Sequence, residues 1–314
     1  MISIIMSIFN ERFEWIKLSI ESMLNQTYSD YELIIIVDNP QIPQNIKRYL
    51  DSLEKENSKI IICYNSENVG LALSLNKALK ISKGQYIARM DADDISMKNR
   101  LEVELDFIKR TNSDVVFSNR ILIDEEGNEI LKCKNLVSNV EEELLLANVV
   151  VHPTVLMKSE VVKRNGGYRN FRRSQDYDLW LRLLTDNCKF AGLDRYLLYY
   201  RISSNNLSKS NKLEQYYANK YQKKLYIERK KYNGRDSFSE KKYKQYIDDK
   251  HITDRKNKKA LKCFEYLEKC RDNKISAKSL LYLISAFFIM PNIFFEVSIN
   301  ALKKIYKRRK KGDK

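Results

Sequence analysis

Apolar residues follow two different spacings along the first 95 positions of the chain. Runs of about four to eight apolar residues are typical of buried strands, and apolar residues three or four positions apart are typical of helices. The strands and helices predicted on this basis alternate in the order 2–9, 13–24, 31–37, 42–56, 59–64, 71–81 and 86–90. Such continuous apolar strands indicate an α/β fold with a parallel sheet covered on both faces.

Polar side chains recur where these strands end. They are Glu11, Asp38, Asn68 and Asp91. In an α/β sheet the carboxyl ends of parallel strands lie side by side, and ligands usually bind there. We therefore expect four separate segments to converge on one crevice.

The fourth strand runs directly into three carboxylates, Asp91, Asp93 and Asp94. Acids this close repel one another unless a cation lies among them, and the simplest such cation is a divalent metal that carries a phosphate. The alternative is an acidic turn that caps the next helix, with Asp94 or Ser96 as the N-cap residue.

The pattern continues beyond residue 100. The expected elements are a helix, a strand, a hairpin with a turn at Gly127, a helix and a short apolar segment, at 101–108, 114–118, 121–131, 140–147 and 155–157. A further helix is expected to open near Gln175, with Asp176 and Asp178 at its start. Helix dipoles favour anions at this end, so a structural role is the alternative for both acids.

The net charge of +16 belongs to the C-terminal third of the chain. Residues 1–205 hold 27 Lys and Arg against 29 Asp and Glu, whereas residues 206–314 hold 30 against 12, a net charge of +18. This asymmetry indicates an acidic partner surface, either anionic lipid or nucleic acid.

The five cysteines form no Cys-x-x-Cys pair, which argues against a disulfide framework and a zinc site and for reduced cytosolic thiols. The apolar first nine residues lack the basic leader and cleavage site of a signal peptide, so we expect a cytoplasmic protein.

Several motifs within residues 1–205 resemble those of the family 2 glycosyltransferases of GT-A fold. They are residues 7–11 (SIFNE), 22–28 (SMLNQTY), 32–38, 68–70 (NVG), the Asp-x-Asp signature within 84–94, and 175–183. Residues 152–154 (HPT) and 166–168 (GGY) resemble bacterial members that build capsule, O-antigen and exopolysaccharide. The resemblance implies a Rossmann-like mixed sheet at 1–205 and a helical extension at 206–314.

The resemblance also implies roles for individual residues. Asp38 would accept a hydrogen bond from uracil, Phe9 and Glu11 would bound the base and ribose, and Asn68 and Gly70 would lie along the nucleotide. Asp91 would meet the ribose or the metal, Asp93 would ligate Mn²⁺ or Mg²⁺, and Asp176 would be the general base.

Two further residues are assigned by hypothesis. His152 could be another metal ligand, since imidazole accepts Mn²⁺, or a hydrogen-bonded histidine in the turn before Pro153. Arg201 could pair with phosphate.

The extension contains an apolar helix at about 279–299, followed by a basic tail at 303–311. Its apolar run at 280–295 is shorter than the ~20 residues needed to span a bilayer. Together the two signals predict binding to an anionic membrane surface, on the inner face of the cell membrane. The alternative is a helix that packs on the catalytic domain.

The sequence thus predicts an inverting, metal-dependent transferase. It would move a hexose or N-acetylhexosamine, with galactose or glucose favoured, from a UDP-sugar to a lipid-linked glycan. A nucleotidyltransferase is one alternative, although residues 7–11 are not a glycine-rich phosphate loop; a non-catalytic membrane-binding or nucleic-acid-binding protein is the other. We expect no nucleic-acid partner, and a homo-oligomer stays open.

Overall fold

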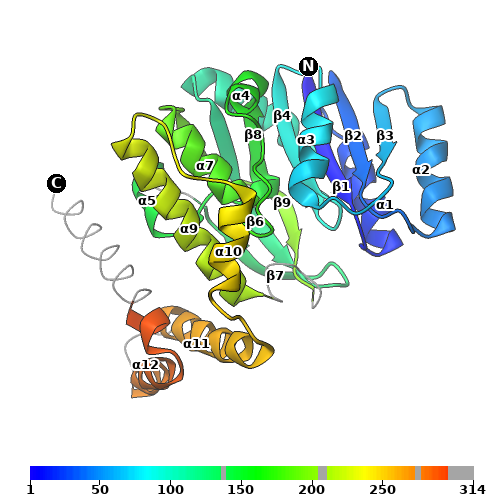
Figure 1. Ribbon diagram of the computed structural model, residues 1–314. Helices are drawn as coiled ribbons and strands as arrows, with labels where there is room; N and C mark the ends of the chain where they lie inside the picture. Colours follow the sequence, from blue (N-terminus) through cyan, green and yellow to red (C-terminus); the bar gives the residue numbers. More distant parts are fainter. Residues whose placement is uncertain (136–138, 204–210, 273–276, 296–314) are drawn as a thin grey trace. The chain divides into compact units, whose positions relative to one another are not determined.

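The computed structural model describes residues 1–135, 139–203, 211–272 and 277–295 (Figure 1). The chain forms two compact units, of which the first comprises residues 1–203 and 222–237 and the second residues 204–221 and 238–314. Helix α9 (Lys212–Lys231) therefore contributes residues 222–231 to the first unit. The expected boundary after residue 205 stays a prediction.

The first unit is built on a mixed sheet of nine strands in the order β3-β2-β1-β4-β8-β6-β9-β5, with β7 paired to β6. The strands are β1 (Ile2–Ile8), β2 (Tyr31–Val37), β3 (Ile60–Tyr64), β4 (Tyr86–Asp91), β5 (Ile95–Ser96), β6 (Val115–Ile123), β7 (Glu129–Cys133), β8 (Val155–Lys158) and β9 (Phe190–Arg201). The first four are mutually parallel, and β8 runs antiparallel to β4 and β6. The four strands and three helices expected in the first 95 residues are confirmed.

Helices cover both faces of this sheet (Figure 1). One apolar layer joins the sheet to α3 (Leu71–Ile81) and α7 (Gln175–Thr185), and the other joins it to α1 (Phe13–Leu24), α2 (Gln44–Glu56) and α4 (Arg100–Thr111). Neighbouring residues of one strand enter opposite layers, as Ile34 and Ile35 of β2 do. This two-sided burial explains the continuous apolar strands of the sequence.

A short polar network fixes the register of the central strands. The Ser3 hydroxyl donates to Glu32 Oε1 over 2.6 Å and accepts from the Gly84 amide over 2.8 Å, while the Lys83 amide donates to Glu32 over 2.7 Å. Gly84 lies so close to β1 that a Cβ atom there would stand 2.5 Å from the Ser3 nitrogen. The network ties β1, β2 and the start of β4 to one alignment.

The second half of the sheet differs from the sequence-based expectation. Residues 115–123 form one strand, β6, where two strands were expected, and β9 and β5 were not anticipated. Strand β9 contains Gly192, Asp194 and Arg195, which interrupt the apolar pattern. Its parallel pairing with β6 and antiparallel pairing with β5 supply the order that local spacing does not reveal.

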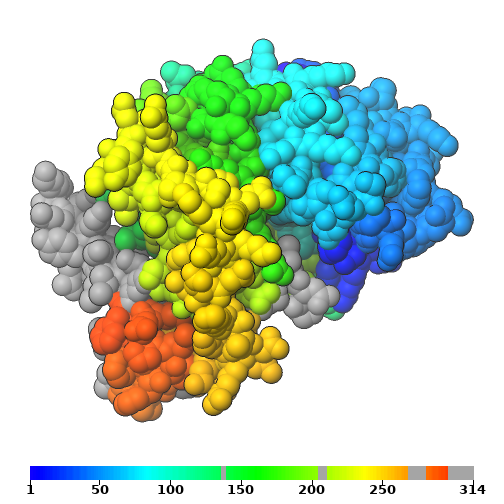
Figure 2. Space-filling view, in the orientation of Figure 1, coloured from blue at the N-terminus to red at the C-terminus, as the bar shows by residue number. Residues whose placement is uncertain are grey.

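The described residues of the second unit are mainly helical, and in Figure 2 part of their surface is formed by α11 (Asp254–Asp272) and the orange-red α12 (Ala277–Ile289). Two helices, α10 (Glu240–Asp248) and α11, are separated by a turn in which His251 has a φ of 47°. Among the described residues, no helix is long and apolar enough to cross a membrane.

We predict that Gly84→Ala lowers the free energy of unfolding by about 1–3 kcal/mol, because the added methyl group collides with the backbone of β1. Denaturant unfolding followed by circular dichroism measures this loss. Gly234→Ala is the control, because nothing lies within 4 Å of a Cβ atom there and only its φ of +86° opposes the change. Equal losses in the two variants would contradict the close approach at Gly84.

Candidate active site

The carboxylate of Asp38, at the end of β2, is buried and closes the loop after β3. Its Oδ1 atom accepts from Asn65 Nδ2 over 2.7 Å and from the Val69 amide over 3.0 Å, and its Oδ2 atom accepts from the Gly70 amide over 2.8 Å. Asn68 Oδ1 also accepts from the Gly70 amide. A carboxylate has about four acceptor sites, so three bonds leave capacity for one further donor.

Residues after β1 lie beside this loop. Asn39 Nδ2 donates to the carbonyl oxygen of Phe9 and to Asn10 Oδ1, each over 2.9 Å, which joins the ends of β1 and β2. The Phe9 ring is exposed, and its backbone amide donates to Glu11 Oε2 over 2.8 Å. Asp38, Asn68, Gly70 and Phe9 thus come together at one sheet edge, as expected.

A buried cation, Arg89, accompanies the acids at the end of β4. Arg89 lies two residues before Asp91 on the same side of the strand, is fully buried, and forms an ion pair with the Asp91 carboxylate. Its Nε and Nη1 atoms have no hydrogen-bond partner among the described residues. Asp94 is buried as well, and its Oδ1 atom accepts from the Arg201 amide over 2.8 Å.

Arg201, at the end of β9, forms hydrogen bonds with the backbone of the turn that carries Asp93. Its Nε atom donates to the Asp93 carbonyl oxygen over 2.9 Å, and its Nη1 atom donates to the carbonyl oxygens of Asp124 and Glu125. The guanidinium carbon also lies 5.1 Å from the centre of the Trp15 ring. These contacts favour a structural role, and pairing of Arg201 with phosphate stays a prediction.

Asp176 stands in the first turn of α7, and its Oδ2 atom accepts from Asn148 Nδ2 over 2.7 Å. Burial raises the pKa of Asp176 to about 6, while the Asn148 hydrogen bond lowers it. Asp178 has the structural role that was the alternative for it, because it is fully buried and accepts from Arg182 Nε over 2.8 Å.

The acids of the site act on one another. Burial and then the charges of Asp91 and Glu11 together raise the pKa of Asp93 to about 7. Asp91 also raises the pKa of Asp176. The fold therefore brings Glu11, Asp91, Asp93 and Asp176 within electrostatic reach, although they come from three segments far apart in the sequence.

The carboxylates of Asp91 and Asp93 fit a divalent cation. Mg²⁺ is usually held by one or two carboxylates and completes its shell with phosphate and water, so Asp91 and Asp93 would suffice. Burial and the neighbouring acids raise the pKa of Asp93, and the buried Asp94 Oδ2 atom has no partner among the described residues, so a bound cation would stabilise both carboxylates. Within the described part of the chain, no group of three or more His, Cys, Asp or Glu residues could hold a metal.

His152 is buried and makes a 2.8 Å hydrogen bond between its Nε2 atom and the Tyr168 hydroxyl. Burial and then the charge of Arg89 lower its pKa well below the usual range. These contacts favour the hydrogen-bonded alternative over the metal-ligand hypothesis.

Sequence reasoning missed Arg89, Asn65 and Asn148 as members of the site. Arg89 was read as part of an apolar strand, and the only signal against this was its charge in a buried segment. Asn65 and Asn148 lie in connecting segments, where asparagine is common, so only their contacts identify them.

Comparisons with known proteins agree with this geometry. The family described as glycosyl transferase family 2 matches residues 3–188. The chain is 35% identical to an uncharacterized glycosyltransferase of Methanocaldococcus jannaschii over 226 residues, which are 69% of this chain and 78% of that protein. It is 36% identical to an O-antigen biosynthesis glycosyltransferase of Escherichia coli over 214 residues, which are 67% of this chain and 83% of that one.

Solved structures show the same fold. The crystal structure of S. aureus TarS 1–349 in complex with UDP-GlcNAc matches with a TM-score of 0.60 at 16% identity, over 78% of this chain and 70% of that one. A longer TarS chain, of which this chain spans 42%, matches with a TM-score of 0.55. The GT-A fold expected from the sequence is thereby confirmed.

We predict that the acid cluster makes stability depend on pH. Because the pKa of Asp93 in the folded protein, about 7, exceeds its ordinary value of 3.8, its stabilising contribution is lost as pH rises from 3.8 to 7. Thermal unfolding without metal should show a smaller loss of stability between pH 5 and pH 8 in Asp93→Asn than in the wild type. Asp106→Asn, which removes an exposed carboxylate, is the control. Parallel curves for Asp93→Asn and wild type would contradict the predicted shift.

Proposed function

Because this chain belongs to glycosyl transferase family 2, we propose that it transfers a hexose or N-acetylhexosamine from a UDP-sugar to a hydroxyl of a lipid-linked glycan during synthesis of a cell-surface polysaccharide. The observation that carries the proposal is the separation of two kinds of acid at one sheet edge. Asp91 ends β4 and Asp93 follows it, where burial and neighbouring acids raise the pKa of Asp93, whereas Asp176 lies in the first turn of α7 and accepts a hydrogen bond from an uncharged amide.

The relatives support this reading in outline. Proteins named for O-antigen, amylovoran and teichuronic acid biosynthesis match between 67% and 68% of the chain. The TarS complexes contain UDP-GlcNAc or UDP, which supports a nucleotide-sugar donor here. The family match favours this function over a nucleotidyltransferase and over a non-catalytic protein.

The nucleotide would bind at the ends of β1, β2 and β3. Asp38 has capacity to accept a hydrogen bond from the uracil N3–H group, and Phe9 would pack on the base. Glu11, Asn68 and Gly70 would border the ribose and the diphosphate. Asp91 and Asp93 would hold Mn²⁺ or Mg²⁺, which when bound neutralises the charge of the departing diphosphate.

Asp176 would remove the proton from the acceptor hydroxyl while the oxygen of that hydroxyl attacks the anomeric carbon. The bond from this carbon to the diphosphate oxygen breaks on the opposite side, so the anomeric configuration is inverted. A pKa of about 6 leaves Asp176 mostly ionised at neutral pH, and basic enough to accept a proton. A single displacement needs no second carboxylate as a nucleophile.

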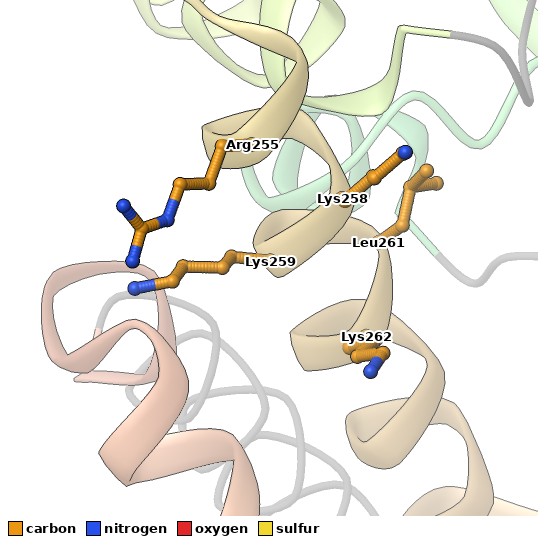
Figure 3. Close-up of a pocket in the computed structure, with 5 residues that line it drawn as sticks. All are labelled: Arg255, Lys258, Lys259, Leu261 and Lys262. Carbon is orange, nitrogen blue, oxygen red and sulfur yellow. The ribbon is translucent and has the colours of Figure 1, made fainter.

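The second unit supplies a surface for the lipid-linked acceptor. Figure 3 shows a pocket of α11 lined by four basic side chains and one leucine, namely Arg255, Lys258, Lys259, Leu261 and Lys262. Helix α12 exposes Leu281, Ile284 and Phe288, which share one face by their spacing. Exposed apolar and basic groups together favour binding to an anionic bilayer from the cytoplasmic side. The basic residues 303–311 lie outside the described residues.

We predict that Asp176→Asn lowers turnover by about 10²- to 10⁴-fold, because the variant cannot accept the proton. UDP release from UDP-galactose, UDP-glucose, UDP-GlcNAc and UDP-GalNAc, each with and without Mn²⁺, measures this loss and identifies the donor. UDP affinity should stay unchanged, because Asp176 does not bind the nucleotide. If the wild type neither turns over a donor nor binds UDP, the proposed function fails.

We predict that replacing Leu281, Ile284 and Phe288 together by serine lowers binding to vesicles that contain phosphatidylglycerol by at least about tenfold, because three exposed apolar side chains no longer enter the bilayer surface. Vesicle co-sedimentation measures binding, with phosphatidylcholine vesicles as the uncharged comparison. Ile130 and Leu131, which are equally exposed on β7, are replaced by serine in the control. Unchanged binding of the α12 variant would show that this face does not contact lipid.

A further inference from the structure

Asn148, in the segment between α5 (Val140–Leu146) and the 3₁₀ turn His152–Thr154, belongs to no motif of the sequence. Its Nδ2 atom donates to Asp176 Oδ2 over 2.7 Å. Its Oδ1 atom is buried and has no partner within the described chain. A buried amide oxygen without a donor is destabilising, so this asparagine is unfavourable for folding at its position.

The contacts around Asn148 fix its distance from α7. The Tyr177 hydroxyl donates to the Leu144 carbonyl oxygen, and Trp180 Nε1 donates to the Val150 carbonyl oxygen over 3.2 Å. Both donors belong to α7, the helix that Asp176 begins. The segment that carries Asn148 is thus bound to the helix of the base before and after the asparagine.

Residues of α9 that belong to the first unit hold the same two segments (Figure 1). Lys223 Nζ donates to the Leu146 carbonyl oxygen over 3.1 Å, two residues before Asn148. The buried Gln222 donates to the Ser174 carbonyl oxygen over 3.0 Å. Ser174 directly precedes α7 and has a φ of 54°, a left-handed conformation that is strained for a non-glycine residue. The backbone two residues before Asp176 is therefore strained, and the side chain of Gln222 on α9 holds it in place.

We propose that Asn148 is the positioning residue of the base, which holds the Asp176 carboxylate in the orientation that receives the proton of the acceptor. The inference rests on the proposed function of Asp176. Nδ2 fixes one carboxylate oxygen and leaves the other for the acceptor hydroxyl. The amide is uncharged, so it stabilises the ionised carboxylate without neutralising its charge. A lysine or arginine at this position would neutralise that charge.

Other titratable groups face Asp176 as well. Asp91 of β4 raises its pKa, and Tyr168, in the loop after α6 (Ser159–Arg164), and Tyr177 of α7 are buried within its field. On α9, the cation that binds the segment of Asn148 is Lys223, through the Leu146 carbonyl oxygen. None of these groups changes when Asn148 is replaced. A change in the pKa of Asp176 is therefore due to the loss of the Asn148 amide.

The test compares Asn148→Leu, Asn148→Asp and wild type in the full chain. Asn148→Leu removes the donor and the unpartnered oxygen together. We expect it to be at least as stable as wild type in thermal unfolding, to bind UDP equally well, and to lose about 10- to 100-fold in turnover. The acidic limb of its pH–rate profile should move to higher pH, because Asp176 loses a hydrogen bond that favours its ionised form. Asn148→Asp, nearly equal in shape, should move the limb further through like-charge repulsion.

Asn165→Leu is the matched control, because Asn165 Nδ2 donates to Asp186 Oδ2 over 2.9 Å at the opposite end of α7. It should leave turnover and the limb unchanged. Carbon-13 NMR of the Asp176 carboxyl, assigned through Asp176→Asn, reports the same titration without any substrate. This separates the inference from the proposed function, since a wild type without turnover would refute only the latter. An Asp176 titration that is equal in wild type, Asn148→Leu and Asn148→Asp would overturn the positioning role.

Discussion

The parallel pairing of β1 with β2 and β4 is the constraint on which the rest of the molecule depends. It sets Ser7 beside Ile36 on one side and beside Asp91 on the other. Because side chains alternate along a strand, a slip of one residue would turn Asp91 to the opposite face and bury it in an apolar layer. The hydrogen bonds that join Ser3, Glu32 and the Gly84 segment at the far end of the strands prevent this slip, and thereby fix the site some six residues away.

The alignment concentrates negative charge, and the fold compensates for it with arginine. Arg89 lies in the apolar layer under Asp91, and Arg201 holds the backbone of the Asp93 turn while its guanidinium lies near the Trp15 ring. A buried cation with one partner is costly unless nearby anions offset it. Glu11, Asp91 and Asp94 provide that field, since Arg89 acts on each of them. Burial, and then the charges of Asp91 and Glu11, still raise the pKa of Asp93, so a cation at this position would stabilise its carboxylate.

The sequence was sufficient to predict the structure wherever the local apolar pattern and the tertiary structure agree. Four buried strands, each followed by a polar residue, predicted both the sheet and the edge at which Asp38, Asp91 and Asp93 meet. Strand β9 escaped because its pairing partners, not its own composition, make it a strand. Arg201 was expected to meet phosphate because of its type, yet it donates to three backbone carbonyl oxygens. Asn148 could not be found, because its one distinguishing property is a contact across 28 residues.

The C-terminal third of the chain consequently has two physical roles that its composition conceals. Residues 222–237 belong to the first unit, where Gln222 and Lys223 bind carbonyl oxygens on either side of the Asp176–Asn148 pair. The exposed basic and apolar side chains lie in α11 and α12 of the second unit. A chain cut after residue 205 would therefore lose the contacts of Gln222 and Lys223 together with the exposed side chains of α11 and α12, so its inactivity would not identify which of the two is required. Substitutions on α12 leave residues 222–237 unchanged, so they separate the two groups of side chains.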